Sequence, residues 1–178
     1  MGWSLGCQPF KEPELLDRFL LAAGKSLCLA TAYERKCRFI LRIMDIVQHY
    51  EDTGDSSASL KLAMTLKDKM LAQTVKGMSC YSVLSESEVA LLERAKDARN
   101  FIAQESTATG LVNSASREVI MSLYDQLRQE VEALVAGDNI VSRMVYEIEE
   151  KEPAPKYIYE AYSSKITDWV FGDSMPRE

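Results

Sequence analysis

Apolar residues recur every three or four positions along most of this chain, in long stretches separated by short polar breaks. This is the period of a helix that buries one face, whereas a half-buried strand alternates at every second residue. Only eight glycines and five prolines interrupt the pattern. The sequence therefore predicts an all-α protein, a helical bundle of about five long helices at residues 13–23, 27–49, 57–77, 85–107 and 114–136.

Local signals mark the ends of several of these helices. Pro13 suits a first helical turn, where its missing N–H leaves no bond unmade. Gly24 either breaks the first helix or only weakens it. The run Gly137-Asp138-Asn139 predicts the end of the last long helix, because glycine and asparagine are typical of positions just past a helix.

The C-terminal part has a different character. Residues 140–149 fit a helix or a strand, and 149–156 form a charged connector whose prolines prevent a continuous helix. A short aromatic extension with Trp169 and Phe171 follows, and we expect it to pack on the bundle or on a partner chain. We therefore divide the chain into an N-terminal segment, a helical domain and a C-terminal extension, at residues 1–12, 13–150 and 151–178.

Composition limits the function further. The 178 residues suit one hydrophobic core, and the net charge of −6 gives no global attraction for a phosphate backbone, so nucleic-acid binding must be local. The four cysteines form no C-x-x-C pair and have no histidine at zinc-ligand spacing, so we expect no metal and no cofactor. No long apolar run or signal-peptide pattern occurs, which predicts a cytoplasmic protein without a membrane segment.

The stretch SESEVALLERAKDARNFIAQEST is the best-defined helix of the chain. It opens with Ser85 and Glu88, the S-x-x-E pattern in which hydroxyl and carboxylate each satisfy a free backbone amide. Arg99 lies at the edge of its apolar stripe. A guanidinium is costly to bury unpaired, so Arg99 reaches water, meets a carboxylate such as Asp97 or Glu105, or faces a cleft.

The run Arg-Asn-x-x-Ala late in this helix resembles the R-x4-6-H signature of HEPN domains, all-helical proteins that often act as metal-independent ribonucleases. The resemblance implies a homodimer whose cleft binds RNA or a nucleotide, with Arg99 stabilising the pentacoordinate phosphate and Asn100 positioning the 2′-hydroxyl. Gln104 stands where the family has histidine. Glutamine cannot titrate, and general acid–base help is worth roughly 10²- to 10⁴-fold in rate, so the resemblance implies weak or lost ribonuclease activity.

Spacing places a condition on such a site. Five residues turn an ideal helix by about 500°, which leaves Arg99 and Gln104 roughly 140° apart. A site that uses both residues needs a second chain or a distorted turn. The only histidine, His49, lies far upstream, where we expect it to interact with terminal helix carbonyls. A glutamine at position 104 is also what an inactivating substitution of the signature histidine would leave.

One basic stripe occurs in this acidic chain. Arg35, Arg38 and Arg42 lie at positions i, i+3 and i+7. They fit a solvated helix face that pairs in part with Glu34 and Asp45. They also fit an electrostatic track that holds an RNA backbone beside the signature arginine.

Together these features predict a HEPN-like protein of toxin–antitoxin or defence type, with an antitoxin of the nucleotidyltransferase type as a candidate partner. Whether it is an enzyme is open, because the titrating residue of the signature is missing. The alternative is a non-catalytic structural or interaction bundle unrelated to RNA.

Overall fold

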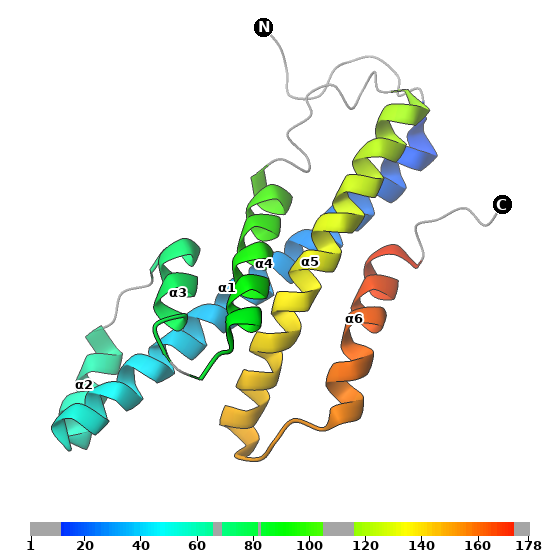
Figure 1. The fold of residues 1–178 in the computed structure, drawn as a ribbon. Coiled ribbons are helices and arrows are strands. Elements are labelled where there is room, and N and C mark those ends of the chain that lie inside the picture. The colour runs from blue at the N-terminus through cyan, green and yellow to red at the C-terminus, as the bar shows by residue number, and fades with distance from the viewer. Residues whose placement is uncertain (1–11, 66–68, 82, 105–115, 173–178) are drawn as a thin grey trace, which may run out of the picture.

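The computed structural model describes residues 12–65, 69–81, 83–104 and 116–172, and within these ranges all regular secondary structure is helical (Figure 1). The all-α prediction is therefore confirmed. The helices, in chain order, are α1 (Pro13–Thr53), α2 (Ser56–Thr65), α3 (Leu71–Met78), α4 (Glu86–Gln104), α5 (Arg117–Glu150) and α6 (Lys156–Phe171).

The division into helices differs from the prediction of about five long ones. Helix α1 has 41 residues and runs unbroken through Gly24, so two predicted helices are one. Helices α2 and α3 replace the single helix predicted at 57–77. Helix α5 has 34 residues and continues through Gly137 to Glu150, so the segment 140–149 is helix and not strand.

Two helix starts and one helix end follow local chemistry. Pro13 is the first residue of α1, as predicted, and Gly54 ends this helix in the left-handed conformation, with φ 67° and its N–H bonded to Tyr50 O at 2.8 Å. Before α4, the Ser85 N–H donates to Glu88 Oε2 at 2.9 Å and the Glu88 N–H donates to Ser85 Oγ at 3.3 Å. The predicted S-x-x-E cap is confirmed.

Gly137 lies where α5 packs most closely against α4. A Cβ at this position would be 2.3 Å from the Ala95 Cβ and 3.5 Å from the Tyr33 ring, so no larger residue fits without moving the helices. Tyr33 of α1 is fully buried there, and its hydroxyl donates to Leu92 O at 3.0 Å. The predicted helix end at Gly137 is therefore wrong, because this glycine permits a close approach of helices and does not terminate one.

The next residue, Asp138, ties three helices together. Its carboxylate is fully buried and accepts from Lys36 Nζ of α1 at 2.9 Å on both oxygens. The Tyr162 hydroxyl of α6 donates to the same carboxylate. Burial and the charge of Asp138 raise the pKa of Tyr162, which keeps the phenol protonated and able to donate. We call the contact region around Tyr33, Lys36, Ala95, Gly137 and Asp138 the helix crossing.

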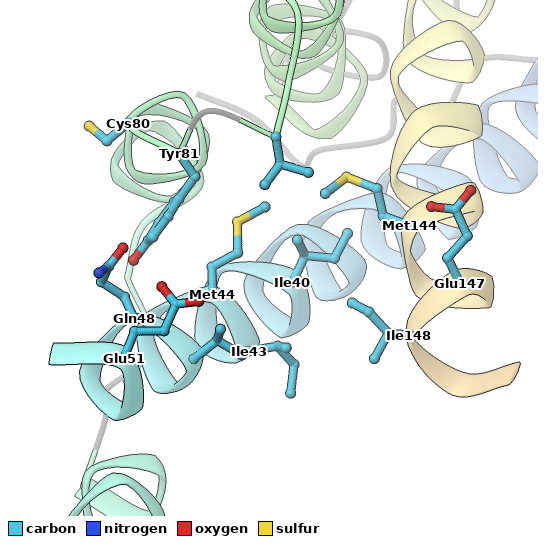
Figure 2. A pocket seen from close by; sticks show the side chains of 12 residues that line it. Ile40, Ile43, Met44, Gln48, Glu51, Cys80, Tyr81, Met144, Glu147 and Ile148 are labelled. Atoms are coloured by element: carbon cyan, nitrogen blue, oxygen red, sulfur yellow. The ribbon is translucent and has the colours of Figure 1, made fainter. Parts of the chain in front are cut away.

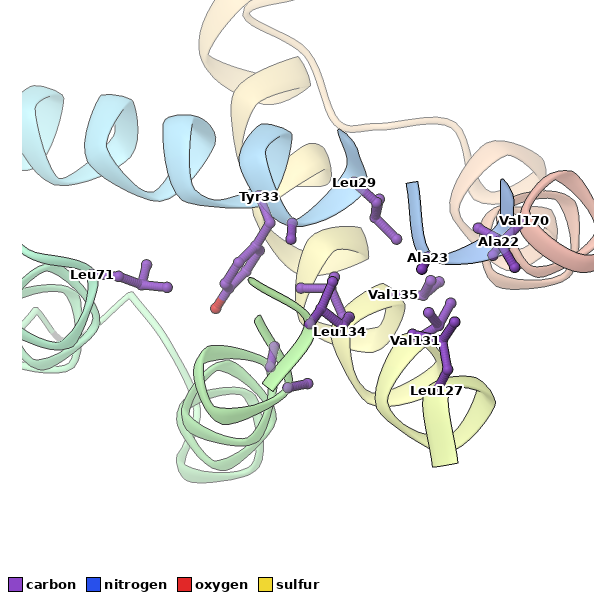
Figure 3. Close-up of a cluster of buried hydrophobic side chains, with 14 of the residues drawn as sticks. Ala22, Ala23, Leu29, Tyr33, Leu71, Leu127, Val131, Leu134, Val135 and Val170 are labelled. Carbon is purple, nitrogen blue, oxygen red and sulfur yellow. The ribbon is translucent and has the colours of Figure 1, made fainter. Parts of the chain in front are cut away.

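Helix α6 completes the core from the other side of α5. Its last residues, Val170 and Phe171, are buried, and the Phe171 ring packs on Tyr124 with centroids 5.4 Å apart. Lys25 Nζ of α1 donates to the Trp169 carbonyl at 2.7 Å. Residues 156–171 thus form a helix that packs on α5 and α1. Figure 3 shows part of the shared core, including Ala22, Ala23, Leu127, Val131, Val135 and Val170.

The C-terminal part of α1 extends away from the other long helices, with α2 beside it (Figure 1). His49 joins these two helices, because its Nδ1 hydrogen-bonds with Ser59 Oγ at 2.9 Å. It does not bind the terminal carbonyls that we expected; instead Thr53 Oγ1 donates to the His49 carbonyl at 2.7 Å. The C-terminal part of α1 also lines the cavity described below.

Candidate functional site

Arg99 of α4 is held in an ion pair with Glu34 of α1. Its side chain is 24% exposed, and Nη1 also donates to Asn100 Oδ1 at 3.2 Å. The sequence suggested Asp97 or Glu105 as the carboxylate partner; among the described residues the partner is Glu34, and Glu105 lies outside them. Arg99 links α4 to α1 in this position.

Glu34 accepts from a second guanidinium, that of Arg38 one turn further along α1. Its side chain is 13% exposed, so this carboxylate lies largely buried between two arginines of different helices. The Arg99 Nε is buried and has no hydrogen-bond partner among the described residues. A group that is already neutralised by a fixed carboxylate attracts a phosphate less than an unpaired arginine does.

The remaining signature residues lie at different depths. Asn100 is partly buried beside Arg99, whereas Gln104, the last described residue of α4, is exposed. Within one chain Arg99 lies beside Asn100 and shares Glu34 with Arg38, whereas Gln104, one turn beyond Asn100, is exposed. In the basic stripe, Arg35 is exposed and Arg42 is half-buried.

A cavity that the sequence did not predict lies away from Arg99. It lies between the C-terminal part of α1, the link before α4 and the C-terminal end of α5, and its volume is about 540 Å³ (Figure 2). We call it the α1–α5 groove. It is lined by Ile40, Ile43, Met44, Val47, Gln48, Glu51, Cys80, Tyr81, Val83, Met144, Glu147 and Ile148.

The surface of the α1–α5 groove is mostly aliphatic. Figure 2 shows Met44 and Ile40 of α1 facing Met144 and Ile148 of α5. At its edge Val83 is 71% exposed, although a residue of this type is usually buried. Such a volume falls within the ~300–1,000 Å³ of ordinary ligand sites, which are also mostly apolar.

The charges of the groove are all of one sign. Among the described residues that line it, the ionised side chains are the carboxylates of Glu51 on α1 and Glu147 on α5, and neither lysine, arginine nor histidine occurs. Cys80 is exposed, with Sγ 3.3 Å from Lys76 O. The arrangement can bind an apolar group and attract a cation, but it contains no paired nucleophile and base.

Tyr81 forms one fixed wall of the groove. Its hydroxyl donates to Asp45 Oδ1 at 2.8 Å, and Asp45 in turn pairs with Lys69 at 3.2 Å. Burial, reinforced by the bond to Asp45, raises the pKa of Tyr81 to about 12. The phenol therefore stays protonated at neutral pH and holds the ring in place.

A smaller apolar hollow lies on the neighbouring side of α1. Its volume is about 290 Å³, and it is lined by Ile46, Val47, Tyr50, Ser56, Ser59 and Leu60. Val47 lines both cavities and is 49% exposed. The C-terminal part of α1 therefore presents apolar side chains on two sides.

The apolar spacing in the sequence marks the face of α1 that lines the groove, but it does not show that this face is left uncovered. Ile40, Met44 and Val47 continue the same three- and four-residue spacing as the core residues before them. Periodicity shows which face of a helix is apolar, but not where the covering helix ends. The predicted helix at 27–49 already contained this part of the stripe; that the other helices leave it partly uncovered is seen only in the structure.

Two further findings concern only the described part of the chain. No group of three or more histidine, cysteine, aspartate or glutamate side chains is placed to hold a metal ion there. No helix in the same ranges combines the length and the apolar character needed to cross a membrane.

Comparison with known proteins gives no match to any family model, to any curated protein or to any solved structure.

Proposed function

We propose that this chain is a non-catalytic helical interaction module whose binding site is the α1–α5 groove. The observation that carries the proposal is the open apolar cavity of about 540 Å³ where α1 and α5 diverge. Soluble proteins bury most such surface, and a contiguous exposed apolar patch is typical of a binding site. The state of Arg99 agrees, because its pairing with Glu34 favours a structural role.

The groove can be tested with a neutral apolar dye such as Nile red and with methyl NMR of the methionines. Met44 and Met144 line the groove, whereas Met78 is fully buried in the core. The dye should become fluorescent and shift the methyl signals of Met44 and Met144, but not that of Met78. Shifts of all three methyls would instead indicate loosening of the core.

A matched pair of substitutions gives the control. Val47→Asp places a charge in the groove and should lower dye binding by at least tenfold, because an ionised carboxylate is costly to desolvate. Val119→Asp changes the same residue type at a comparable exposure, 48% against 49%, on the distant end of α5 and should leave binding unchanged. Equal losses in both variants would contradict the groove as the site.

The HEPN-like function, RNA or nucleotide binding at a dimer cleft, is the second candidate. The observation that favours it is that the guanidiniums of Arg38 and Arg99 come together from two helices, although both are paired with Glu34. If RNA displaces this carboxylate, Glu34→Gln should tighten RNA binding and Arg99→Ala should weaken it.

An assay of RNA cleavage in the presence of a chelator, which inactivates metal-dependent nucleases, distinguishes the two candidate functions. An interaction module predicts no cleavage by the wild type or by Arg99→Ala. Cleavage that Arg99→Ala abolishes would make the ribonuclease reading primary, with Asn100 and Gln104 as the next residues to substitute.

A further inference from the structure

The α1–α5 groove has the shape of a trough between helices. The α1 residues that line it recur at the spacing of one helical face, from Ile40 to Glu51. Eleven steps at 1.5 Å give this wall a length of about 16 Å, or three helical turns. The opposite wall is another helical face, formed by Met144, Glu147 and Ile148 of α5. That second wall is shorter, since the four steps from Met144 to Ile148 give about 6 Å, or one helical turn. A trough with one long and one short helical wall fits an incoming helix that lays its apolar face against them.

Both walls also end at this part of the molecule with negative charge. The last turn of α1 and the last turn of α5 contain no basic residue. The C-terminus of a helix carries about half a negative charge from its aligned peptide dipoles; Lys151, the residue that caps α5, offsets this in part, whereas α1 is capped by Gly54. Glu51 in the lining adds to this potential, as do the exposed Glu149 and Glu150 at the end of α5. Glu147 adds to it only in part, because Arg143 Nε lies 3.9 Å from its carboxylate.

The walls of the trough can adapt to ligands of different shape. Met44 and Met144 lie on opposite walls, and methionine fits differently shaped apolar partners because its side chain is unbranched and polarisable. A site of this kind accepts a partner helix with leucine, isoleucine or phenylalanine anchors. Its selectivity then comes from charge at the edges of the trough.

We infer that the ligand of the α1–α5 groove is a cationic amphipathic helix of a partner protein, with aliphatic anchors between Met44 and Met144 and lysine or arginine side chains at Glu51 and Glu147. This inference rests on the proposed function, because it names the class of partner for the same groove. Charge complementarity selects this occupant over a neutral or acidic one. A second copy of this chain, with its net charge of −6, lacks the excess of positive charge that the rim favours.

The test uses three synthetic 18-residue peptides and the full chain. One carries leucine on one helical face and lysine on the other, the second replaces lysine by glutamate, and the third is a scramble of the first without an apolar face. Binding is measured by calorimetry and by the methyl signals of Met44 and Met144. The leucine–lysine peptide should bind at least tenfold tighter than either of the others.

Charge variants then locate the contact. Glu51→Gln with Glu147→Gln should weaken the leucine–lysine peptide about fivefold at low salt, because each exposed pair contributes little on its own. Asp125→Asn with Glu132→Gln changes the net charge equally, at exposed positions on the distant part of α5, and should leave affinity unchanged.

The outcomes separate this inference from the proposed function. If the leucine–glutamate peptide binds as tightly, or if both charge variants lose affinity equally, the cationic ligand is wrong although the groove remains a binding site. If the scrambled peptide matches the first, the attraction is unspecific and the inference also fails. If neither the peptides nor Nile red bind, the proposed function itself is wrong. A dimer in solution that Val47→Asp dissociates would identify a second copy as the occupant and overturn the inference.

Discussion

Helices α1 and α5 are in tight contact at the helix crossing and diverge toward their C-terminal ends. At the crossing, Lys36 of α1 reaches the buried Asp138 of α5, and on the same α5 turn Gly137 admits Ala95 of α4 so closely that no side chain fits. From Ile40 of α1 and Met144 of α5 onward, these two helices line the α1–α5 groove. A fixed crossing sets the angle at which the helices diverge, so a rigid centre can maintain an open site at a distance.

The crossing is most directly broken at Gly137. Gly137→Val should lower the free energy of unfolding by roughly 3 kcal/mol or more, because the added Cβ would overlap Ala95 and force α4 and α5 apart. Urea unfolding followed by circular dichroism measures this change. Gly24→Val is the matched control, since nothing lies within 4 Å of a Cβ there, and it should stay within about 0.5 kcal/mol of the wild type.

The same pair of variants tests the link between the crossing and the groove. Gly137→Val should also weaken Nile red binding, because displaced helices diverge at a different angle. Loss of stability with unchanged dye binding would show that the groove forms independently of the crossing.

The buried ion pair should have the next largest effect. Lys36→Met leaves the Asp138 carboxylate, which is fully buried, without its cation and should cost about 2–3 kcal/mol. The cost falls below that of a fully buried pair because the Lys36 side chain is 28% exposed and water can reach the site.

A second substitution shows whether charge is the cause. Adding Asp138→Asn to Lys36→Met removes the unpaired charge and should recover at least half of the lost stability in the same urea assay. A double variant that is no more stable than Lys36→Met would mean that packing, and not charge, makes the contribution of Lys36.

Glu88, in the first turn of α4, forms an ion pair with Arg143 of α5. Its carboxylate accepts the Ser85 N–H, and its other oxygen accepts from Arg143 at 2.6 Å. The hydrogen bond from the Ser85 backbone, followed by contacts with the Ser85 hydroxyl and Arg143, lowers the pKa of Glu88 below its usual value near 4.5. Because the pKa of Glu88 is lower in the folded than in the unfolded state, its ionised carboxylate stabilises the protein fully above the unfolded-state pKa. This stability is lost as the pH falls through the folded-state pKa.

Glu88→Gln should therefore cost about 1 kcal/mol at pH 7 and progressively less below pH 4.5. Thermal unfolding at a series of pH values gives the comparison. Glu86→Gln makes the same change in the same first turn of α4 and should show a smaller, flatter difference. A constant gap between Glu88→Gln and the wild type across this range would exclude an ionised cap.

These contrasts also explain what the sequence could predict. Pro13 and the Ser85–Glu88 cap act within one helical turn, so their neighbours in sequence were sufficient to identify them. Gly137 and Asp138 look locally like a helix end, but their roles depend on Ala95 of α4 and Lys36 of α1. Tertiary contacts of this kind override a local preference, and no spacing rule contains them.

The two candidate sites were also predictable from the sequence to different degrees. Arg99 was identified at the edge of its helix, and the need for a carboxylate was stated, but its partner Glu34 lies 65 residues earlier in the chain. The groove was missed because Met44, which is half-buried in its lining, is indistinguishable in sequence from a core methionine such as Met78. Whether an apolar face is covered depends on the lengths and angles of other helices.

The smallest effect on stability, and the sharpest contrast with the crossing, is expected at the edge of the groove. Val83 is 71% exposed, so Val83→Ser should change the free energy of unfolding by less than about 0.5 kcal/mol. Val75→Ser makes the same change at a side chain that is 1% exposed and should cost about 2 kcal/mol or more. Peptide affinity should respond in the opposite order, falling about threefold in Val83→Ser because an apolar contact with the ligand is lost. If Val83→Ser instead destabilises the protein as strongly as Val75→Ser, the groove is closed in solution and its residues belong to the core.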